Sequence, residues 1–203
     1  FLASTCAECH IHFIGRTPSP KILLKAFAEV RPNVIFCVPL IIEKIYKKQI
    51  QPLLARPSVR WVLSIPFLDQ PVLAQIRKKL VDAFGGNFSQ IVVGGAPLNA
   101  EVEEFFTKIK FPFTVGYGMT ECAPLISYTE AKDFISKSSG KVLDGIMEVK
   151  IDRPDPNTGV GEIFVRGENV MSGYYKNPEA TEQILDADGW LHLQPVPRSG
   201  RLR

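Results

Sequence analysis

The residues of this 203-residue chain best suited to chemistry lie together in the segment Val115-Gly116-Tyr117-Gly118-Met119-Thr120-Glu121. An aromatic ring can lie against a nucleotide base, and a hydroxyl can donate to a phosphate oxygen. A carboxylate can hold a Mg²⁺ ion that neutralises phosphate charge. The glycines on both sides of the ring let backbone approach a ligand closely. A glycine-rich turn that carries a surface glutamate is the structural alternative, so the surrounding elements decide the interpretation.

Two short apolar strands are predicted to bring this segment and a second glycine-bearing loop to one place. Residues 90–98 (QIVVGGAPL) are typical of a strand that ends in glycines, and Asn99 is expected to cap a helix that runs through Thr107. Residues 111–115 form the next apolar run, so the order strand, helix, strand indicates a βαβ unit. Because open parallel sheets bind ligands at the carboxyl ends of their strands, both loops should face one crevice.

Several segments now point to one family. Tyr117-Gly118-Met119-Thr120-Glu121 resembles the Tyr-Gly-x-Thr-Glu motif of the adenylate-forming (AMP-binding) superfamily. Residues 94–98 (GGAPL) and 161–175 (GEIFVRGENVMSGYY) are similar to two further motifs of these enzymes, and residues 177–181 and 188–192 follow in the family's order. The likeness covers residues 15–192. Within the superfamily, the chain is most similar to bacterial long-chain fatty acyl-CoA synthetases.

The resemblance implies a two-step ligation. A carboxylate attacks the α-phosphate of ATP, pyrophosphate leaves, and the acyl-adenylate passes to the thiol of CoA. ATP, Mg²⁺, CoA and a long-chain fatty acid are therefore the expected substrates and cofactors. Tyr117 would stack on adenine, Thr120 would bond the α-phosphate and Glu121 would hold Mg²⁺, which makes Thr120 and Glu121 the candidate catalytic residues.

The resemblance also implies a set of residues around the ligands. The candidate nucleotide-binding residues are Gly94, Gly95, Ala96, Pro97, Gly116, Tyr117, Gly118, Met119 and Thr120. Val38 and Pro39, together with Gly94, would line the acyl pocket. For Val38 and Pro39, ordinary core packing is an equal alternative.

The chain departs from the family pattern at both ends. Residues 1–16 do not match the family's phosphate loop, which is rich in Ser, Thr and Gly and ends in Lys. Leu193-Gln194-Pro195 stand where the family has Thr-Gly-Asp, whose aspartate binds the ribose, and the basic residues 197–203 resemble nothing in it. We therefore expect a central fragment of a ligase that is inactive by itself. Residues 193–203 are expected to form an atypical tail.

The remaining patterns predict an α/β fold. Helical spacing of apolar residues predicts helices at 18–30, 39–50 and 71–84, and residues 34–38 are expected to form a buried strand. Alternation at 148–152 and 162–166 predicts an antiparallel hairpin around a turn at 154–159, followed by a short helix at 177–185 that Asn177 caps. We predict a parallel-sheet α/β subdomain with flanking helices at 1–139, which carries the site, and a smaller antiparallel β subdomain at 140–192.

Composition limits the partners. The net charge of +3 is too small to indicate nucleic-acid binding, and the longest apolar run, residues 34–42, is shorter than the ~20 residues of a membrane span. Lys44, Lys47, Lys48 and the basic run 77–79 are expected to be solvated helix faces. We expect a cytoplasmic protein that binds small molecules, with peripheral contact at the inner membrane face as an alternative. The oligomeric state stays open.

The N-terminal cysteines offer a competing interpretation. Cys6-Ala7-Glu8-Cys9-His10 satisfies the Cys-x-x-Cys-His attachment signature of c-type haem, and His12 adds a zinc ligand. The βα pattern that follows does not fit a small haem protein, and no second ligand pair for zinc lies nearby. We therefore expect no haem and no zinc. Cys37 is expected in the core, and Cys122 is expected to line the pocket without redox work.

Two further functions stay open at this level. The enzyme could adenylate another carboxylic acid, such as an aryl or amino acid. The chain could also be a nucleotide-binding module without catalysis.

Overall fold

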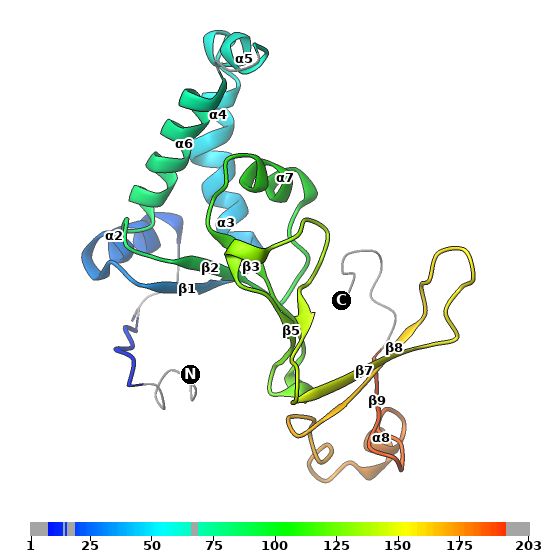
Figure 1. Cartoon of the computed structure of the whole chain (residues 1–203). Helices are drawn as coiled ribbons and strands as arrows, with labels where there is room; N and C mark the ends of the chain where they lie inside the picture. The colour runs from blue at the N-terminus through cyan, green and yellow to red at the C-terminus, as the bar shows by residue number, and fades with distance from the viewer. Residues whose placement is uncertain (1–7, 14, 16–18, 66–68, 194–203) are drawn as a thin grey trace. The chain divides into compact units, whose positions relative to one another are not determined.

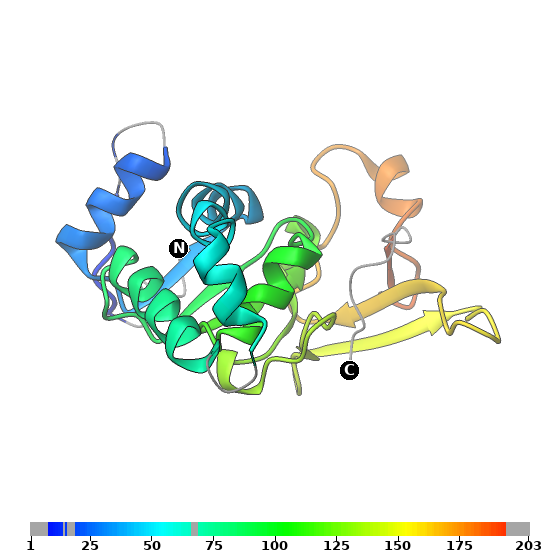
Figure 2. The ribbon, with the colours of Figure 1, turned by 90° about the horizontal axis from the view of Figure 1, so that it is seen from above.

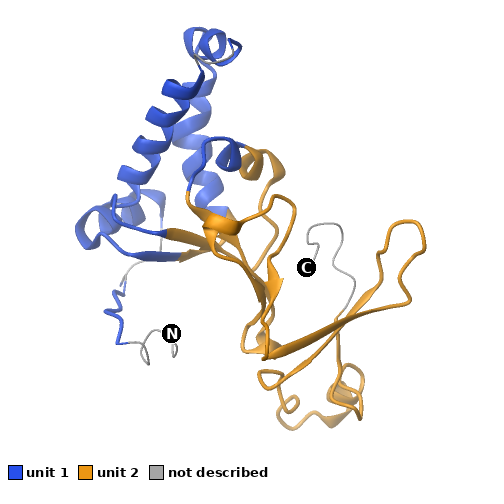
Figure 3. Ribbon diagram, viewed as in Figure 1, with its two compact units in different colours: residues 1–35, 40–89, 105–111 blue, residues 36–39, 90–104, 112–203 orange. Residues whose placement is uncertain are grey.

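The computed structural model describes residues 8–13, 15, 19–65 and 69–193. The chain divides into two compact units (Figure 3). Unit 1 comprises residues 1–35, 40–89 and 105–111, and unit 2 comprises residues 36–39, 90–104 and 112–203. Unit 2 contains every residue that the sequence assigns to the nucleotide and acyl sites. It also contains residues from both sides of position 140, where the sequence predicted a subdomain boundary.

Unit 1 is helical (Figure 1). Its long helix α6 (Asp69–Ala83) buries Leu73, Ile76 and Leu80 and packs against α2 and α5. The predicted helix at 39–50 is confirmed, but its second half is a π-helix. The helices of this region are α2 (Pro20–Val30), α3 (Pro39–Ile45), the π-helix η1 (Tyr46–Ile50), α4 (Gln51–Leu54) and α5 (Pro57–Leu63).

Gly85 ends the α6 segment for a steric reason. Its φ is +96°, and a Cβ at this position would lie 2.4 Å from the carbonyl oxygen of Phe27. Only glycine therefore fits between the end of α6 and helix α2. Next to this turn, the ring of Phe84 contacts the rings of Phe27, Phe88 and Phe111, which form the aromatic core of unit 1.

The predicted βαβ unit is present. Strands β1 (Val34–Cys37), β2 (Gln90–Val93) and β3 (Phe113–Val115) form a parallel sheet in that order, and Ile91 pairs with Phe113. Helix α7 (Ala100–Lys108) connects β2 to β3. Asn99 caps it as expected, since its Oδ1 accepts hydrogen bonds from the Glu101 and Val102 amides at 3.0 and 3.3 Å.

Strand β1 is not buried as predicted. Ile35 is buried and Cys37 is partly buried, whereas Val34 and Val38 are about half exposed and Phe36 is 74% exposed. Val34, Phe36 and Val38 alternate along the chain and therefore share one face of the strand. This face of β1 is exposed among the described residues, whereas Ile35 on the opposite face is buried.

The rest of unit 2 is antiparallel. Strands β4 (Tyr117–Gly118), β5 (Leu125–Tyr128) and β6 (Lys141–Val142) form one sheet, and β7 (Met147–Asp152), β8 (Glu162–Gly167) and β9 (Leu191–Leu193) form another. Short 3₁₀-helices η2 (Thr120–Cys122) and η3 (Ala131–Asp133) lie between these strands. The predicted hairpin is the long β7–β8 pair (Figure 2), which runs in register from Met147↔Gly167 to Asp152↔Glu162.

Local capping also follows the sequence pattern. Asp155 Oδ1 accepts hydrogen bonds from the amides of Asn157 and Thr158, which closes the predicted turn. Asn177 caps α8 (Pro178–Glu182) through a 3.1 Å bond from the Ala180 amide, although the helix ends three residues earlier than predicted.

The core of unit 2 reaches the start of the expected tail. Leu193 in strand β9 is 2% exposed and pairs with Ile163 in strand β8. It belongs to a buried cluster whose members are Cys122, Ile126, Met147, Val165, Leu191 and Leu193. The described part of the 193–203 segment is therefore strand, and residues 194–203 lie outside the described structure.

The side chains of Trp190 and His192 contact residues on the other face of this sheet. The Trp190 ring lies between the Lys150 ammonium, 4.0 Å from the ring centre, and the Arg166 guanidinium at 4.6 Å. The His192 ring stacks on Phe164 with ring centres 3.9 Å apart. Cation–π and stacking contacts therefore stabilise this face of β7, β8 and β9.

Within the described ranges, no helix is both long and apolar enough to cross a bilayer.

Candidate functional site

The two predicted glycine loops meet at the carboxyl edge of the parallel sheet. The Gly94 amide donates to the Cys37 carbonyl at 3.2 Å, and the Gly116 amide donates to the Val93 carbonyl at 3.0 Å. The residues that follow β1, β2 and β3 are thus neighbours. A Cβ on Gly95 would lie 3.9 Å from Val38 Cγ1, and one on Gly94 would lie 3.6 Å from the Gly116 carbonyl oxygen.

The first loop offers accessible backbone. Gly95, Ala96 and Pro97 are exposed, and Gly95 has a φ of +84°, which favours glycine. Leu98 then turns into the core and leads to the Asn99 cap of α7. The loop is fixed at both ends while its middle stays open to solvent, an arrangement that suits ligand contact through backbone.

Val38 and Pro39 differ in exposure at the end of β1. Val38 is 50% exposed beside Gly95, whereas Pro39 is buried at the first position of α3. The position of Val38 is compatible with contact to a ligand, and the burial of Pro39 matches the core-packing alternative.

The glycines that follow β3 have a structural role in the fold. Tyr117 and Gly118 form the short strand β4, which pairs with β5, instead of a loop. A Cβ on Gly118 would lie 1.8 Å from the Pro124 carbonyl oxygen, and one on Gly116 would lie 3.3 Å from Leu125 Cδ1. Gly118 is therefore required by the close approach of the chain's own backbone.

Tyr117 and Met119 are both partly buried against the core of unit 2. Burial, and after it the neighbouring Cys122, raise the pKa of Tyr117 above its usual value. The phenol therefore stays neutral at physiological pH. Tyr117 is only partly buried, so its side chain stays accessible for contact with a base.

Thr120 and Glu121 occupy the 3₁₀-helix η2 immediately after β4. The Thr120 side chain is exposed and has no hydrogen-bond partner among the described residues. Glu121 is partly buried, and its Oε1 accepts a 2.7 Å hydrogen bond from the Tyr174 hydroxyl. That hydrogen bond, followed by burial and the carboxylate charge, raises the pKa of Tyr174.

The donor set at η2 fits a metal ion that arrives with a nucleotide. Mg²⁺ is commonly held by one or two carboxylates plus substrate phosphates and water. Within the described ranges, no group of three His, Cys, Asp or Glu side chains gathers to hold a metal. Glu121 is a single carboxylate whose second oxygen is not engaged by any described residue. The site therefore fits phosphate-bound Mg²⁺ and does not resemble a protein-only metal cage.

Cys122 does not line a pocket, contrary to the sequence prediction. It is fully buried in the core of unit 2, because η2 turns it away from Glu121 toward Ile126. Burial and the Glu121 charge raise the pKa of the Cys122 thiol to about 11. Cys37 is mostly enclosed, and burial raises its pKa to about 12. Cys9 is exposed, and Cys6 lies outside the described residues.

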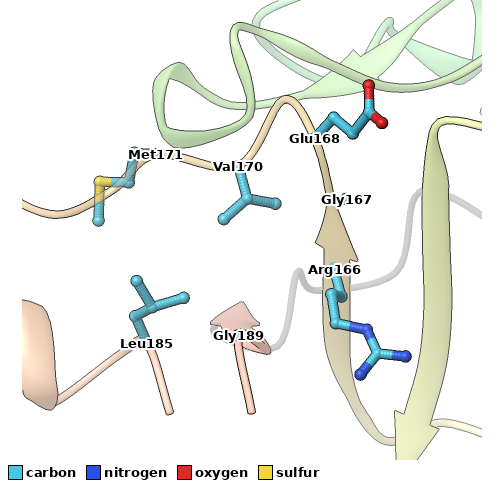
Figure 4. Close-up of a pocket in the computed structure, with 7 residues that line it drawn as sticks. All are labelled: Arg166, Gly167, Glu168, Val170, Met171, Leu185 and Gly189. Atoms are coloured by element: carbon cyan, nitrogen blue, oxygen red, sulfur yellow. The ribbon is translucent and has the colours of Figure 1, made fainter. Parts of the chain in front are cut away.

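A separate pocket, unrecognised from the sequence, lies beside strand β8 (Figure 4). Its volume is about 450 Å³, and Val170 and Leu185 point toward one another across it while the Glu168 carboxylate turns away. Its lining residues are Arg166, Gly167, Glu168, Val170, Met171, Leu185 and Gly189. None of these belongs to the predicted nucleotide site. The candidate nucleotide site lies instead where strands β2 and β3 end.

The sequence profile of the AMP-binding enzyme family matches residues 1–175. The chain belongs to the AMP-binding enzyme family. This confirms the superfamily expected from the motifs, and the parallel sheet followed by antiparallel sheets confirms the predicted fold class.

Two curated relatives illustrate the range of the family. A 4-coumarate-CoA ligase of Narcissus pseudonarcissus is 37% identical over 151 residues, which cover 68% of this chain and 26% of that protein. A peroxisomal long chain acyl-CoA synthetase of Arabidopsis thaliana is 32% identical over 204 residues, which cover 86% of this chain and 28% of that protein. The chain thus spans about a quarter of the length of these curated relatives.

The fold is shared with solved structures. The o-succinylbenzoate coenzyme A synthetase of Bacillus subtilis, solved in complex with AMP, superimposes with a TM-score of 0.60 at 22% identity. The match covers 94% of this chain and 33% of that one.

Proposed function

We propose that this chain is the central segment of an ATP-dependent acyl-CoA ligase, which activates a carboxylic acid as an acyl-adenylate and transfers it to CoA. One observation carries the proposal. The glycine-bearing segments that follow β2 and β3 converge at the carboxyl edge of a parallel sheet. The second continues through the short strand β4 into an exposed hydroxyl and a partly buried carboxylate. Family membership supports the nucleotide, and the names of the curated relatives support CoA.

The nucleotide is proposed to lie along the two loops. The backbone of residues 94–97, of which Gly95, Ala96 and Pro97 are exposed, approaches the base, and the Tyr117 ring stacks on it. Gly116, Gly118 and Met119 flank this ring in the chain, and Met119 packs with Tyr117 against the core of unit 2. Base–aromatic stacking is worth roughly 1–3 kcal/mol. This arrangement orients the α-phosphate toward η2.

Thr120 and Glu121 are proposed to act on the phosphates. The Thr120 hydroxyl donates to an α-phosphate oxygen as the carboxylate of the acid attacks and pyrophosphate leaves. Glu121 holds Mg²⁺, which neutralises phosphate charge and so favours departure of pyrophosphate. The chain's own contribution is to hold the reacting groups in line, as in phosphoryl transfer generally.

We propose a long-chain fatty acid as the acid. The Arabidopsis long chain acyl-CoA synthetase aligns with 86% of this chain, against 68% for the Narcissus coumarate ligase. Val38, with Pro39 and Gly94 beside it, would contact the acyl group. An aryl acid is the second candidate, because the coumarate ligase is the more identical of the two relatives, at 37% against 32%.

A substrate panel tests the assignment. The full-length ligase is incubated with ATP, Mg²⁺ and CoA together with palmitate, 4-coumarate, benzoate or an amino acid, and AMP and the CoA thioester are measured. The proposal predicts the fastest thioester formation with palmitate. Faster turnover with 4-coumarate would move the enzyme to the aryl branch. Adenylation of an amino acid without thioester would refute a CoA ligase.

A further inference from the structure

A second segment of unit 2 holds the Glu121 region at several points. The Asn169 side-chain amide donates to the carbonyls of Cys122 at 2.7 Å and Leu125 at 2.9 Å. The Met171 amide donates to the Glu121 carbonyl at 2.8 Å, and the Tyr174 hydroxyl donates to the Glu121 carboxylate at 2.7 Å. Both the main chain and the side chain of Glu121 are thus bonded by residues about 50 positions later.

Tyr174 is itself fixed by the start of helix α8. Its amide donates to Thr181 Oγ1 at 2.9 Å, and its carbonyl accepts from the Asn177 amide at 3.2 Å. The Thr181 hydroxyl in turn donates to the Asn177 carbonyl at 3.0 Å. Gly173 has a φ of +139°, and a Cβ there would lie 2.9 Å from Thr181 Cγ2. The backbone of Tyr174 is therefore set from both sides.

These contacts restrict the conformation of the Glu121 carboxylate on the 3₁₀-helix η2. A glutamate side chain loses rotamer freedom when it is ordered, which opposes metal binding. The phenol of Tyr174 engages one carboxylate oxygen before any ligand arrives and leaves the second oxygen unengaged by the described residues. Part of the ordering cost of metal binding is thereby met within the apo fold.

We propose that Tyr174 is a positioning residue that orients the Glu121 carboxylate for nucleotide-bound Mg²⁺, with Thr181 fixing Tyr174 in turn. This inference rests on the proposed function, because it takes Glu121 as the metal carboxylate. Tyr174 touches neither nucleotide nor metal in this account. Its effect is therefore on metal affinity and not on the chemical step at saturating metal.

The test uses the full-length ligase and the variant Tyr174→Phe, which removes only the hydroxyl. The matched control is Tyr175→Phe at the neighbouring tyrosine, which is 88% exposed. Mn²⁺ binding in the presence of ATP is measured by electron paramagnetic resonance. The Mg²⁺ dependence of acid-dependent pyrophosphate exchange is measured in parallel, and thermal unfolding checks the fold.

For Tyr174→Phe we expect the apparent Kd for Mn²⁺ and the half-saturating Mg²⁺ concentration to rise roughly three- to tenfold, the range of one net hydrogen bond. The exchange rate at saturating Mg²⁺ should stay close to wild type. Thr181→Val should shift both quantities in the same direction, which keeps the proposal testable if Tyr174→Phe folds poorly. Tyr175→Phe should leave both within twofold.

Two results distinguish failure of the positioning role from failure of the proposed function. Unchanged or tighter Mn²⁺ binding in Tyr174→Phe and Thr181→Val, with wild-type exchange intact, would overturn the positioning role alone. Absence of acid-dependent exchange and of Mn²⁺–ATP binding in the wild-type ligase would overturn the proposed function and the positioning role with it.

Discussion

Replacing Asn169 should destabilise unit 2 by a measurable amount. Its side-chain amide makes two hydrogen bonds to backbone carbonyls, at 2.7 and 2.9 Å, and these close the turn between η2 and β5. Each such bond contributes about 0.5–1.5 kcal/mol net, so Asn169→Ala should lower the free energy of unfolding by about 1–3 kcal/mol. Asn169 Oδ1 is buried without a partner among the described residues, so its removal offsets part of the loss.

Asn169→Asp sharpens the prediction. The side chain keeps its shape but places a carboxylate against two carbonyl oxygens, so the loss should exceed that of Asn169→Ala. Asn157→Ala is the matched control, because Asn157 lies exposed in the turn between β7 and β8. A change within about 0.5 kcal/mol is expected there.

Urea unfolding followed by tryptophan fluorescence gives the measurement. The two tryptophans are Trp61 in unit 1, which is 66% exposed, and Trp190 in unit 2. A Trp61→Phe background therefore reports unit 2 through Trp190 alone. If Asn169→Ala and Asn157→Ala unfold at the same urea concentration with equal slopes, the two bonds do not support the fold as argued.

Three further predictions concern packing, thiol chemistry and the isolated chain. Gly118→Ala should disrupt the β4–β5 pairing, because its methyl group would lie 1.8 Å from the Pro124 carbonyl oxygen. The control Gly15→Ala should not, because no atom lies within 4 Å of a Cβ there. Amide hydrogen exchange in β5 compares the two variants, and equal protection would count against the packing argument. Folding raises the thiol pKa of Cys122 to about 11 and that of Cys37 to about 12, so alkylation of both should stay slow up to pH 10 while exposed Cys9 reacts. The free energy of unfolding should fall above about pH 9, because there these two thiols ionise in the unfolded chain only. Rapid alkylation of Cys122 at pH 8 would contradict its burial. The isolated 203-residue chain, whose aligned part covers 26% of the Narcissus ligase, should give no AMP or acyl-CoA above a no-enzyme blank with ATP, Mg²⁺, palmitate and CoA. Turnover there would show that this segment suffices for ligation.

Local patterns predicted the elements that depend on neighbouring residues. The Asn99 and Asn177 caps, the turn at Asp155 and the alternation of β7 and β8 are each set within a few positions. The convergence of the loops at Gly94 and Gly116 also followed, because parallel strands share one carboxyl edge.

Contacts between distant residues could not be predicted in this way. The bond between Tyr174 and Glu121 joins positions 53 apart, and the motif that contains Tyr174 gives no indication of its partner. The glycine at 118 looked like ligand-contacting backbone until the register of β4 and β5 placed Pro124 against it. Residues 130–139 carried no pattern, yet Glu103 of α7 holds them by accepting from the Ser136 hydroxyl and the Lys137 amide.

Carboxylate-dependent exchange of labelled pyrophosphate into ATP tests the central claim most directly, because it isolates the adenylation step that we propose for Thr120 and Glu121. The full-length ligase should exchange label when palmitate and Mg²⁺ are present. Glu121→Gln should lose nearly all of this exchange at ordinary Mg²⁺ concentrations, and Glu168→Gln, at an exposed glutamate outside the proposed site, should retain it. Exchange at the wild-type rate in Glu121→Gln, or no exchange by the wild type with any acid of the panel, would contradict the account.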